Sequence, residues 1–221
     1  MRVAIFGATS QIARDLVKSF LNNTEYDICL YARRPEEVRK WLSESKELHP
    51  RFVGDLASFP AQPVPYDAII NLIGSGSPAK TAQMGASILE ITLKFDKVIL
   101  DYITDHPSCR YIFFSSGAAY GSGFEDPVSD HTFARIPINN IQSTDWYGLS
   151  KLHAEYRHRS IPKMGIVDVR VFNYFSSLSD INSRFLITDI LYSIKNNLIL
   201  TTTKENIVRD YIGPREVAPQ I

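Results

Sequence analysis

The strongest chemical signal in the sequence is a tyrosine and a lysine four residues apart, in the run Tyr147-Gly148-Leu149-Ser150-Lys151. Residues four apart share one face of a helix, so Tyr147 and Lys151 are expected side by side. A phenol has an ordinary pKa of about 10 and is a poor base at neutral pH. A nearby ammonium group favours the phenolate and brings it into range for proton transfer. The pair therefore predicts a proton-transfer site, although the same spacing also arises by chance in many helices.

A hydroxyl donor for such a site comes directly after a predicted strand at residues 110–115. The sequence there reads Ser115-Ser116-Gly117-Ala118-Ala119-Tyr120-Gly121. A serine at this place would polarise a carbonyl or an alcohol while the tyrosine exchanges a proton with it. Tyr147 comes two elements after a strand that ends in two serines. This position favours a functional Tyr147–Lys151 pair over a chance spacing.

These residues lie in a chain in which short apolar runs alternate with longer segments of helical period. Predicted strands cover residues 2–6, 27–31, 51–53, 67–72, 110–115, 166–171 and 198–202. Predicted helices cover residues 11–21, 35–45, 81–105, 146–159 and 181–196. Such alternation predicts one α/β domain over residues 1–221, a Rossmann-type, doubly wound parallel sheet with helices on both faces and ligands at the carboxyl ends of its strands.

Composition excludes several classes of protein. The 221 residues carry 24 Lys and Arg against 24 Asp and Glu, which leaves no basic footprint for nucleic acid or for an anionic membrane. No apolar run is long enough to cross a bilayer, and the N-terminus does not read as a signal peptide. Cys29 and Cys109 adjoin apolar strands and are expected to be buried free thiols. We therefore expect a soluble, cytoplasmic protein.

A turn suited to a dinucleotide follows the first predicted strand. It runs Gly7-Ala8-Thr9-Ser10-Gln11-Ile12-Ala13 and leads into a helix. Gly7 can make the tight turn, and the backbone amides that follow, at Thr9, Ser10, Gln11 and Ile12, would face a pyrophosphate at the helix N-terminus. Ser10 and Ala13 replace two expected glycines, so an ordinary strand-to-helix turn is the alternative.

The carboxyl end of the second strand predicts the choice of cofactor. Asp27 precedes this strand and would lie at the wrong edge of the sheet, whereas Arg33 and Arg34 follow it. An arginine there suits a ribose 2′-phosphate, which favours NADP over NAD; solvated arginines are the alternative, preferred for Arg34. Asp55 and Leu56 follow the third strand, and Asn71 and Ile73 the fourth, so all four are candidates for the cofactor rim. Asp55 alone would be a loop acid or a helix cap in most proteins.

Taken together, these motifs resemble the extended short-chain dehydrogenase/reductases, in particular the nucleotide-sugar epimerase/dehydratase group. The resemblance spans the chain through residues 7–13, 54–56, 71–74, 114–121, 147–151, 170–173 and 209–212. It implies that Tyr147 transfers the proton, that Lys151 binds the nicotinamide ribose and lowers the tyrosine pKa, and that Ser116 bonds the reacting oxygen. It further implies that Asp55 meets the adenine and that Asn173 approaches the substrate diphosphate, where a plain loop asparagine is the alternative.

The resemblance implies hydride transfer at C4 of a nucleotide-activated sugar, by a 4-keto reductase or a 4-epimerase. Dehydratases of the group carry Thr-Asp-Glu where this chain has Ser116-Gly117-Ala118, so a dehydratase is disfavoured. A carbonyl reductase of small non-nucleotide substrates and a non-catalytic, NADP-sensing regulator are the alternatives. The resemblance also implies a homodimer through the helices at residues 81–105 and 146–159. His106, His131, His153 and His158 have no acidic partners at ligand spacing, so no metal site is predicted.

The substrate-binding part is expected to be short or truncated. Substrate contacts are predicted from residues 121–145, a loop of about 25 residues, and from residues 172–221, since long loops in compact domains are commonly functional. In the family, most of the substrate-binding portion comes after the Arg209-Asp210-Tyr211 motif, and this chain ends ten residues later, at Ile221.

Overall fold

The sheet is parallel and has six strands. The computed structural model describes residues 1–21, 25–45, 48–61, 64–74, 78–121, 127–161, 164–183, 185–204 and 208–221. In spatial order the strands are β3 (Phe52–Asp55), β2 (Asp27–Ala32), β1 (Arg2–Phe6), β4 (Ala68–Asn71), β5 (Arg110–Ser116) and β6 (Ile166–Val171). This order reverses direction beside β1, so the predicted Rossmann-type fold is confirmed, with its ligand crevice expected at the carboxyl ends of β1 and β4.

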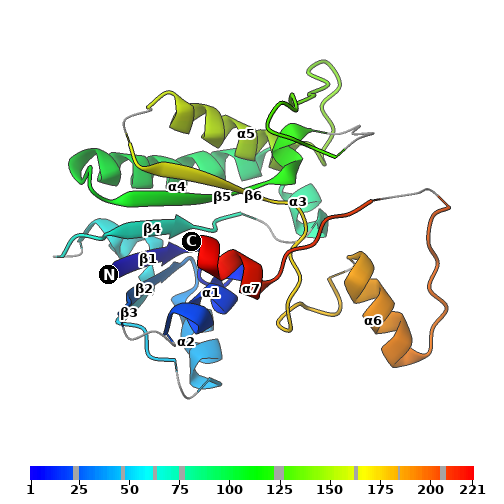
Figure 1. Ribbon diagram of the computed structural model, residues 1–221, viewed down its shortest axis with the longest axis horizontal. Helices are drawn as coiled ribbons and strands as arrows, with labels where there is room; N and C mark the ends of the chain where they lie inside the picture. Colours follow the sequence, from blue (N-terminus) through cyan, green and yellow to red (C-terminus); the bar gives the residue numbers. More distant parts are fainter. Residues whose placement is uncertain are drawn as a thin grey trace.

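Helices cover both faces of the sheet (Figure 1). On one face, α1 (Gln11–Leu21) and α2 (Pro35–Ser43) pack over β1 and β2, and the short α7 (Pro214–Val217) returns to join them. On the other face, α4 (Ser87–Asp105) and α5 (Trp146–Arg159) pack over β4 and β5. Two apolar cores result, one on each face, as expected for strands that read as nearly continuous apolar runs.

The remaining elements lie at the edges of this sandwich. The short 3₁₀ helices η1 (Leu56–Ala61), η2 (Gly117–Tyr120) and η3 (Ala218–Gln220) follow β3, β5 and α7. The helices α3 (Pro78–Met84) and α6 (Leu186–Asn196) complete the chain. Figure 1 shows α6 beyond the carboxyl ends of the strands, away from both helix layers.

Three predicted elements differ from the structure. The helix predicted at residues 81–105 is two helices, α3 and α4, because the chain adopts a left-handed conformation at Gly85 (φ +50°), which ends a helix. The strand predicted at residues 198–202 is wrong: this apolar segment pairs with no strand in the described part of the sheet, and Ile199 is 94% exposed. The last long helix begins at Leu186 instead of residue 181, after an extended Phe185.

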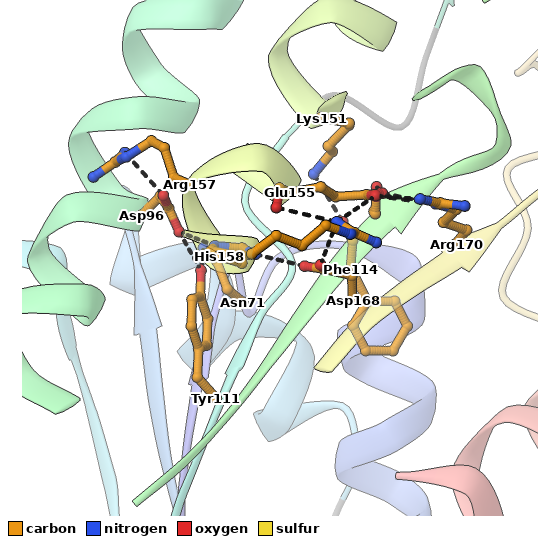
Figure 2. Close-up of polar contacts among 12 residues, drawn as sticks. Asn71, Asp96, Tyr111, Phe114, Lys151, Glu155, Arg157, His158, Asp168 and Arg170 are labelled. Atoms are coloured by element: carbon orange, nitrogen blue, oxygen red, sulfur yellow. Dashed lines mark hydrogen bonds and ion pairs between the residues drawn. The ribbon is translucent and has the colours of Figure 1, made fainter. Parts of the chain in front are cut away.

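A buried carboxylate joins α4 to α5 and to the sheet (Figure 2). Asp96 in α4 is fully buried, and its Oδ1 accepts hydrogen bonds from Tyr111 OH (2.9 Å) and His158 Nε2 (2.8 Å). Its Oδ2 lies 2.9 Å from Nη1 of Arg157. His158 Nδ1 donates to Asp168 Oδ1 of β6 at 2.5 Å. Since both ring nitrogens donate to carboxylates, His158 is an imidazolium; spacing alone predicted no acidic partner for it, whereas the fold supplies two.

A second ion pair holds α5 to the sheet edge about one helical turn before His158. Glu155 is buried and accepts hydrogen bonds from Arg170 of β6, through Nε (2.9 Å) and Nη2 (2.5 Å), and from Ser115 Oγ at 2.5 Å. Burial by itself would raise the pKa of Glu155, but these hydrogen bonds outweigh it and the pKa is lowered. The carboxylate therefore stays charged and fixes α5 against β5 and β6.

The His158 imidazolium makes stability depend on pH. Burial would lower its pKa, but hydrogen bonds to Asp168 and Asp96 raise the pKa to about 9 from the ordinary 6.5. A raised pKa contributes stability that is complete below pH 6.5 and is lost as pH rises toward 9. Between pH 6.5 and 8, urea unfolding should show the wild type losing about 2 kcal/mol relative to His158→Gln, by the linkage of 1.36 kcal/mol per pH unit.

The pH range and a control variant isolate the contribution of His158 to stability. The range stops at pH 8 because Lys151, whose pKa is about 8, begins to titrate there with the opposite sign. The matched control is His153→Gln, which replaces an exposed histidine of the same helix and should leave the wild-type slope unchanged. Parallel pH profiles for the wild type and His158→Gln would contradict the prediction.

Candidate functional site

A cavity of about 620 Å³ lies at the carboxyl ends of the strands. Its walls come from the turn after β1, the ends of β4 and β5, the first turn of α5, and the segments that follow β6. Seven of the predicted site residues line it together: Ser10, Gln11, Ile12, Ser116, Tyr147, Lys151 and Asn173. Residues separated by more than 160 positions in the chain thus meet at one place, as the topology requires.

Tyr147 and Ser116, the predicted proton-transfer residue and its predicted hydroxyl partner, lie within hydrogen-bonding distance of each other. Burial raises the pKa of the Tyr147 phenol, and a hydrogen bond with the Ser116 side chain partly lowers it. Ser116 Oγ also accepts the backbone N–H of Ala118 at 3.2 Å, which fixes its position at the start of η2. The net direction is upward, so Tyr147 is a neutral phenol at neutral pH. The lowering of the tyrosine pKa by Lys151 together with a cationic nicotinamide stays a prediction.

Lys151 lies beneath Tyr147 and is buried (2% exposed). Its Nζ donates to the carbonyl oxygens of Phe114 (2.8 Å) and Ile73 (3.2 Å) and lies 5.8 Å from the centre of the Tyr147 ring. Burial lowers its pKa to about 8, against the opposing charges of Asp96 and Glu155. Two of its three hydrogens are used by the protein, so the third can serve a ligand hydroxyl in the cavity that it lines.

The turn after β1 has the geometry of a phosphate cradle. Gly7 takes a left-handed φ of +76°, and a Cβ there would lie 2.8 Å from the carbonyl of Leu72. Ser10 Oγ accepts the N–H of Ala13 at 3.2 Å, so its own hydroxyl hydrogen remains for a ligand. Gln11 donates to Ser176 Oγ (3.0 Å) and Ser179 Oγ (2.7 Å), which ties the turn to the loop after β6.

The residues predicted for the cofactor rim after β2 and β3 do not line the cavity. Arg33 is exposed at the end of β2, whereas Arg34 pairs with Glu37 at 2.6 Å. Asp55 accepts the N–H of Ser58 at 2.8 Å, so its side chain is engaged as a cap of η1, beside Leu56. Thr9, like Gly7, contributes backbone to the turn and does not line the cavity.

Asn71 has an internal role in the structure. Its side chain is buried; Nδ2 donates to Tyr111 OH (2.8 Å) and Oδ1 accepts the N–H of Ile73 (2.9 Å). It therefore fixes the backbone at the end of β4 and does not reach the cavity. Asn173 lines the cavity while its amide donates to the carbonyl of Asp210 at 2.8 Å.

The two stretches predicted to contact substrate, residues 121–145 and 172–221, both contribute to the walls, through residues that no motif assigned a role; residues 122–126 of the first stretch lie outside the described residues. Thr144 and Arg209 line the cavity, as do the aromatic rings of Phe172, Phe185 and Tyr211. Arg209 belongs to a recognised motif, but its proximity to the cavity follows from the return of the chain after α6. Of the described residues that line the cavity, two are cationic, Lys151 and Arg209, and none is a carboxylate. The charge of the walls suits an anionic ligand.

Substitution at Gly7 tests the cradle. Gly7→Ala would combine a left-handed backbone with a contact of 2.8 Å, so we expect a loss of roughly 2–4 kcal/mol in unfolding free energy and no binding of a nicotinamide dinucleotide. Gly85→Ala is the matched control: its φ is +50°, but a Cβ there meets nothing within 4 Å. This variant should lose about 1 kcal/mol and bind normally. Equal losses in urea unfolding and titration would contradict the prediction.

Comparison with known proteins agrees with this geometry. The model of the family described as the NAD dependent epimerase/dehydratase family matches residues 3–219. A search of curated proteins found no match.

Solved structures similar to this one include two epimerases and a dehydratase, each aligned over 99% of this chain. UDP-glucose 4-epimerase from Bifidobacterium longum, in complex with NAD+ and UDP, has a TM-score of 0.75 at 19% identity over 72% of its own chain. UDP-N-acetylglucosamine 4-epimerase from Methanobrevibacter ruminantium has a TM-score of 0.77 at 16% identity over 70%. dTDP-glucose 4,6-dehydratase from Bacillus anthracis, in complex with NAD, has 0.74 at 14% over 69%. At these identities the likeness shows the shared fold.

Proposed function

The chain belongs to the NAD-dependent epimerase/dehydratase family, and from this premise we propose that it transfers a hydride at C4 of a nucleotide-activated sugar, as a 4-keto reductase or a 4-epimerase. The observation that carries the proposal is the cavity in which Tyr147, Ser116 and Lys151 meet. Its described lining holds two cations and no carboxylate, which suits a diphosphate-bearing substrate beside a dinucleotide. The similar UDP-sugar epimerases support the same substrate class.

The protein has the features that a nicotinamide dinucleotide needs. The backbone of the Gly7–Ile12 turn would hold the pyrophosphate, and the third hydrogen of Lys151 would hold a ribose hydroxyl. The dinucleotide, when bound, supplies or accepts the hydride. Ser116 donates a hydrogen bond to the reacting oxygen, and Tyr147 gives its phenolic proton to that oxygen as a ketone becomes an alcohol. The reverse transfer returns the proton to Tyr147.

A dehydratase reaction remains disfavoured for a structural reason. Elimination of water needs an acid and a base near the sugar, and Gly117 and Ala118 occupy the places where dehydratases of the group carry them. The described residues that line the cavity include no carboxylate. Hydride transfer, coupled to proton transfer through Tyr147, needs neither this acid nor this base.

The cofactor is NADP in this proposal, on the basis of Arg33. This exposed side chain at the end of β2 suits a 2′-phosphate. Arg33→Ala should raise the Kd for NADPH about tenfold, an energy of about 1.4 kcal/mol, and change the Kd for NADH less than twofold. Arg34→Ala is the control, because Arg34 is already paired with Glu37. Wild-type protein that binds NADH as tightly as NADPH would refute the assignment.

A ligand panel tests the substrate class. In the presence of NADPH, one or more UDP-, dTDP- or GDP-sugars should raise the melting temperature, because a ligand that binds only the folded state stabilises it. No shift with any of them would favour a reductase of small, non-nucleotide carbonyl compounds. Absorbance of the purified protein separates the two leading reactions: stoichiometric, non-exchanging NAD indicates an epimerase, and exchangeable NADPH indicates a reductase.

Tyr147→Phe tests the chemistry. Removal of the phenolic hydroxyl should lower kcat by about 10²–10⁴-fold with little change in KM, since the ring and its packing are retained. Tyr156→Phe, at an exposed position of the same helix (60% exposed), should leave both constants unchanged. Full biological activity in Tyr147→Phe would instead favour the non-catalytic, NADP-sensing regulator.

Two further expectations stay predictions. The homodimer would form through α4 and α5, the helices that the resemblance implies. As to location, no helix in the described part of the chain has both the length and the apolar character needed to cross a membrane. The cytoplasmic location is not tested by this observation.

A further inference from the structure

Lys151 carries a charge that its immediate contacts do not neutralise. Its ammonium group is buried, donates to two backbone carbonyls and lies 4.5 Å from the centre of the Phe113 ring. Among the described residues, no carboxylate lies within 4 Å of Nζ. A buried ammonium is costly unless an opposite charge compensates for it. The compensation must therefore come from carboxylates further away.

Asp96 is a carboxylate held in one place by two hydrogen-bond donors and an ion pair. It is fully buried in α4, bonded to Tyr111 OH and His158 Nε2 through one oxygen and facing Arg157 through the other. The surrounding charges come from α5, with Arg157 and His158, and from β6, with Asp168 on the far side of His158. The Asp96 charge is thus fixed and shared with two cations.

Two paths connect Asp96 to Lys151, and Figure 2 shows the start of the first, from Asp96 to Tyr111 and Asn71. Along the first, Tyr111 OH accepts a hydrogen bond from Asn71 Nδ2 (2.8 Å), and Asn71 Oδ1 accepts the N–H of Ile73 (2.9 Å). The carbonyl of the same Ile73 accepts a hydrogen from Lys151 Nζ. The second path is electrostatic and passes the Phe113 ring, which contacts both Lys151 Nζ and the His158 ring, the latter at 5.1 Å between centres.

We propose that Asp96 is a positioning residue for Lys151: its fixed charge keeps the buried lysine protonated, and its bond to Tyr111 orders the Ile73 carbonyl that receives the ammonium. Asp96 touches neither substrate nor cofactor in this arrangement and acts only through Lys151. The consequence for turnover rests on the proposed function, whereas the effect on the lysine does not.

The shift in the pKa of Lys151 agrees with this role of Asp96. Burial lowers the pKa of Lys151 to about 8, and the charges of Asp96 and Glu155 oppose that decrease. Titratable neighbours of the ammonium are Tyr147 and Glu155 on its own helix and Asp96 on α4. Loss of the Asp96 charge should therefore make the lysine lose its proton at lower pH.

Nuclear magnetic resonance of the full chain with isotope-labelled lysine measures the ionisation of Lys151 directly. The Lys151 signal is assigned by its absence in Lys151→Arg, and its chemical shift is followed against pH. In Asp96→Asn the titration midpoint should fall by about one pH unit, a tenfold change in the ionisation constant. Asp101→Asn is the matched control, since it removes an exposed carboxylate of the same helix that pairs with Lys97. It should leave the midpoint unchanged.

A second variant gives a shift of opposite sign. His158→Gln removes a positive charge that Asp96 otherwise shares, so the Lys151 midpoint should rise. Packing damage alone would not move the two midpoints in opposite directions. If Asp96→Asn fails to fold, His158→Gln decides by itself. An unchanged midpoint in folded Asp96→Asn, or a fall in His158→Gln, would overturn the proposal.

The pH dependence of kcat separates this inference from the proposed function. The activity of the wild type should decline as pH rises through the Lys151 midpoint, and Asp96→Asn should shift that decline to lower pH by the same amount as in the spectra. If Asp96→Asn shifts the Lys151 midpoint in the spectra but not the pH profile of kcat, the effect of Asp96 on Lys151 is supported. The proposed role of Lys151 in turnover is then rejected.

Discussion

The site depends on one buried ammonium group. Lys151 reaches from α5 to the carbonyl oxygens at the ends of β4 and β5, and these two bonds place the first turn of α5 above the carboxyl edge of the sheet. Tyr147, one helical turn earlier, consequently lies beside Ser116 at the end of β5. An apolar side chain of similar length, such as methionine, would not hold the same place, since it lacks the donors that two carbonyl groups require.

The two faces of the sheet are stabilised in different ways. On the side of α1 and α2 the core is mainly apolar and its buried carboxylate Asp15 bonds the neutral Tyr174 hydroxyl, whereas on the side of α4 and α5 ion-paired charges lie among apolar side chains. Buried ion pairs contribute little net stability, because desolvation offsets their attraction, yet the loss of one partner is costly. We interpret the charged cluster as an arrangement that fixes α5, and with it Tyr147 and Lys151, in one orientation.

The chain beyond β6 forms the outer wall of the cavity and then returns to the first helix layer. Tyr174 pairs with Ile212 and donates its hydroxyl to Asp15 at 2.9 Å, and Val217 of α7 is buried against the α1 side of the sheet. Between these anchors, α6 and the apolar segment after it lie away from the sheet (Figure 1). The chain covers 69–72% of the length of the similar solved structures.

The sequence by itself determined the sheet, the Gly7 turn and the Tyr147–Ser116–Lys151 set, because local apolar runs and short motifs encode them. It misplaced the segment 198–202, since an apolar run predicts burial without saying whether a neighbouring strand exists. It also could not show that Asp96, His158 and Asp168 meet, or that Asn71 serves the backbone of Ile73 instead of a ligand. His158 is 62 positions from Asp96 and 10 from Asp168, and these three residues carry no motif. Only the packing of α4 and α5 on the sheet brings them within hydrogen-bonding distance, and burial then fixes their charges.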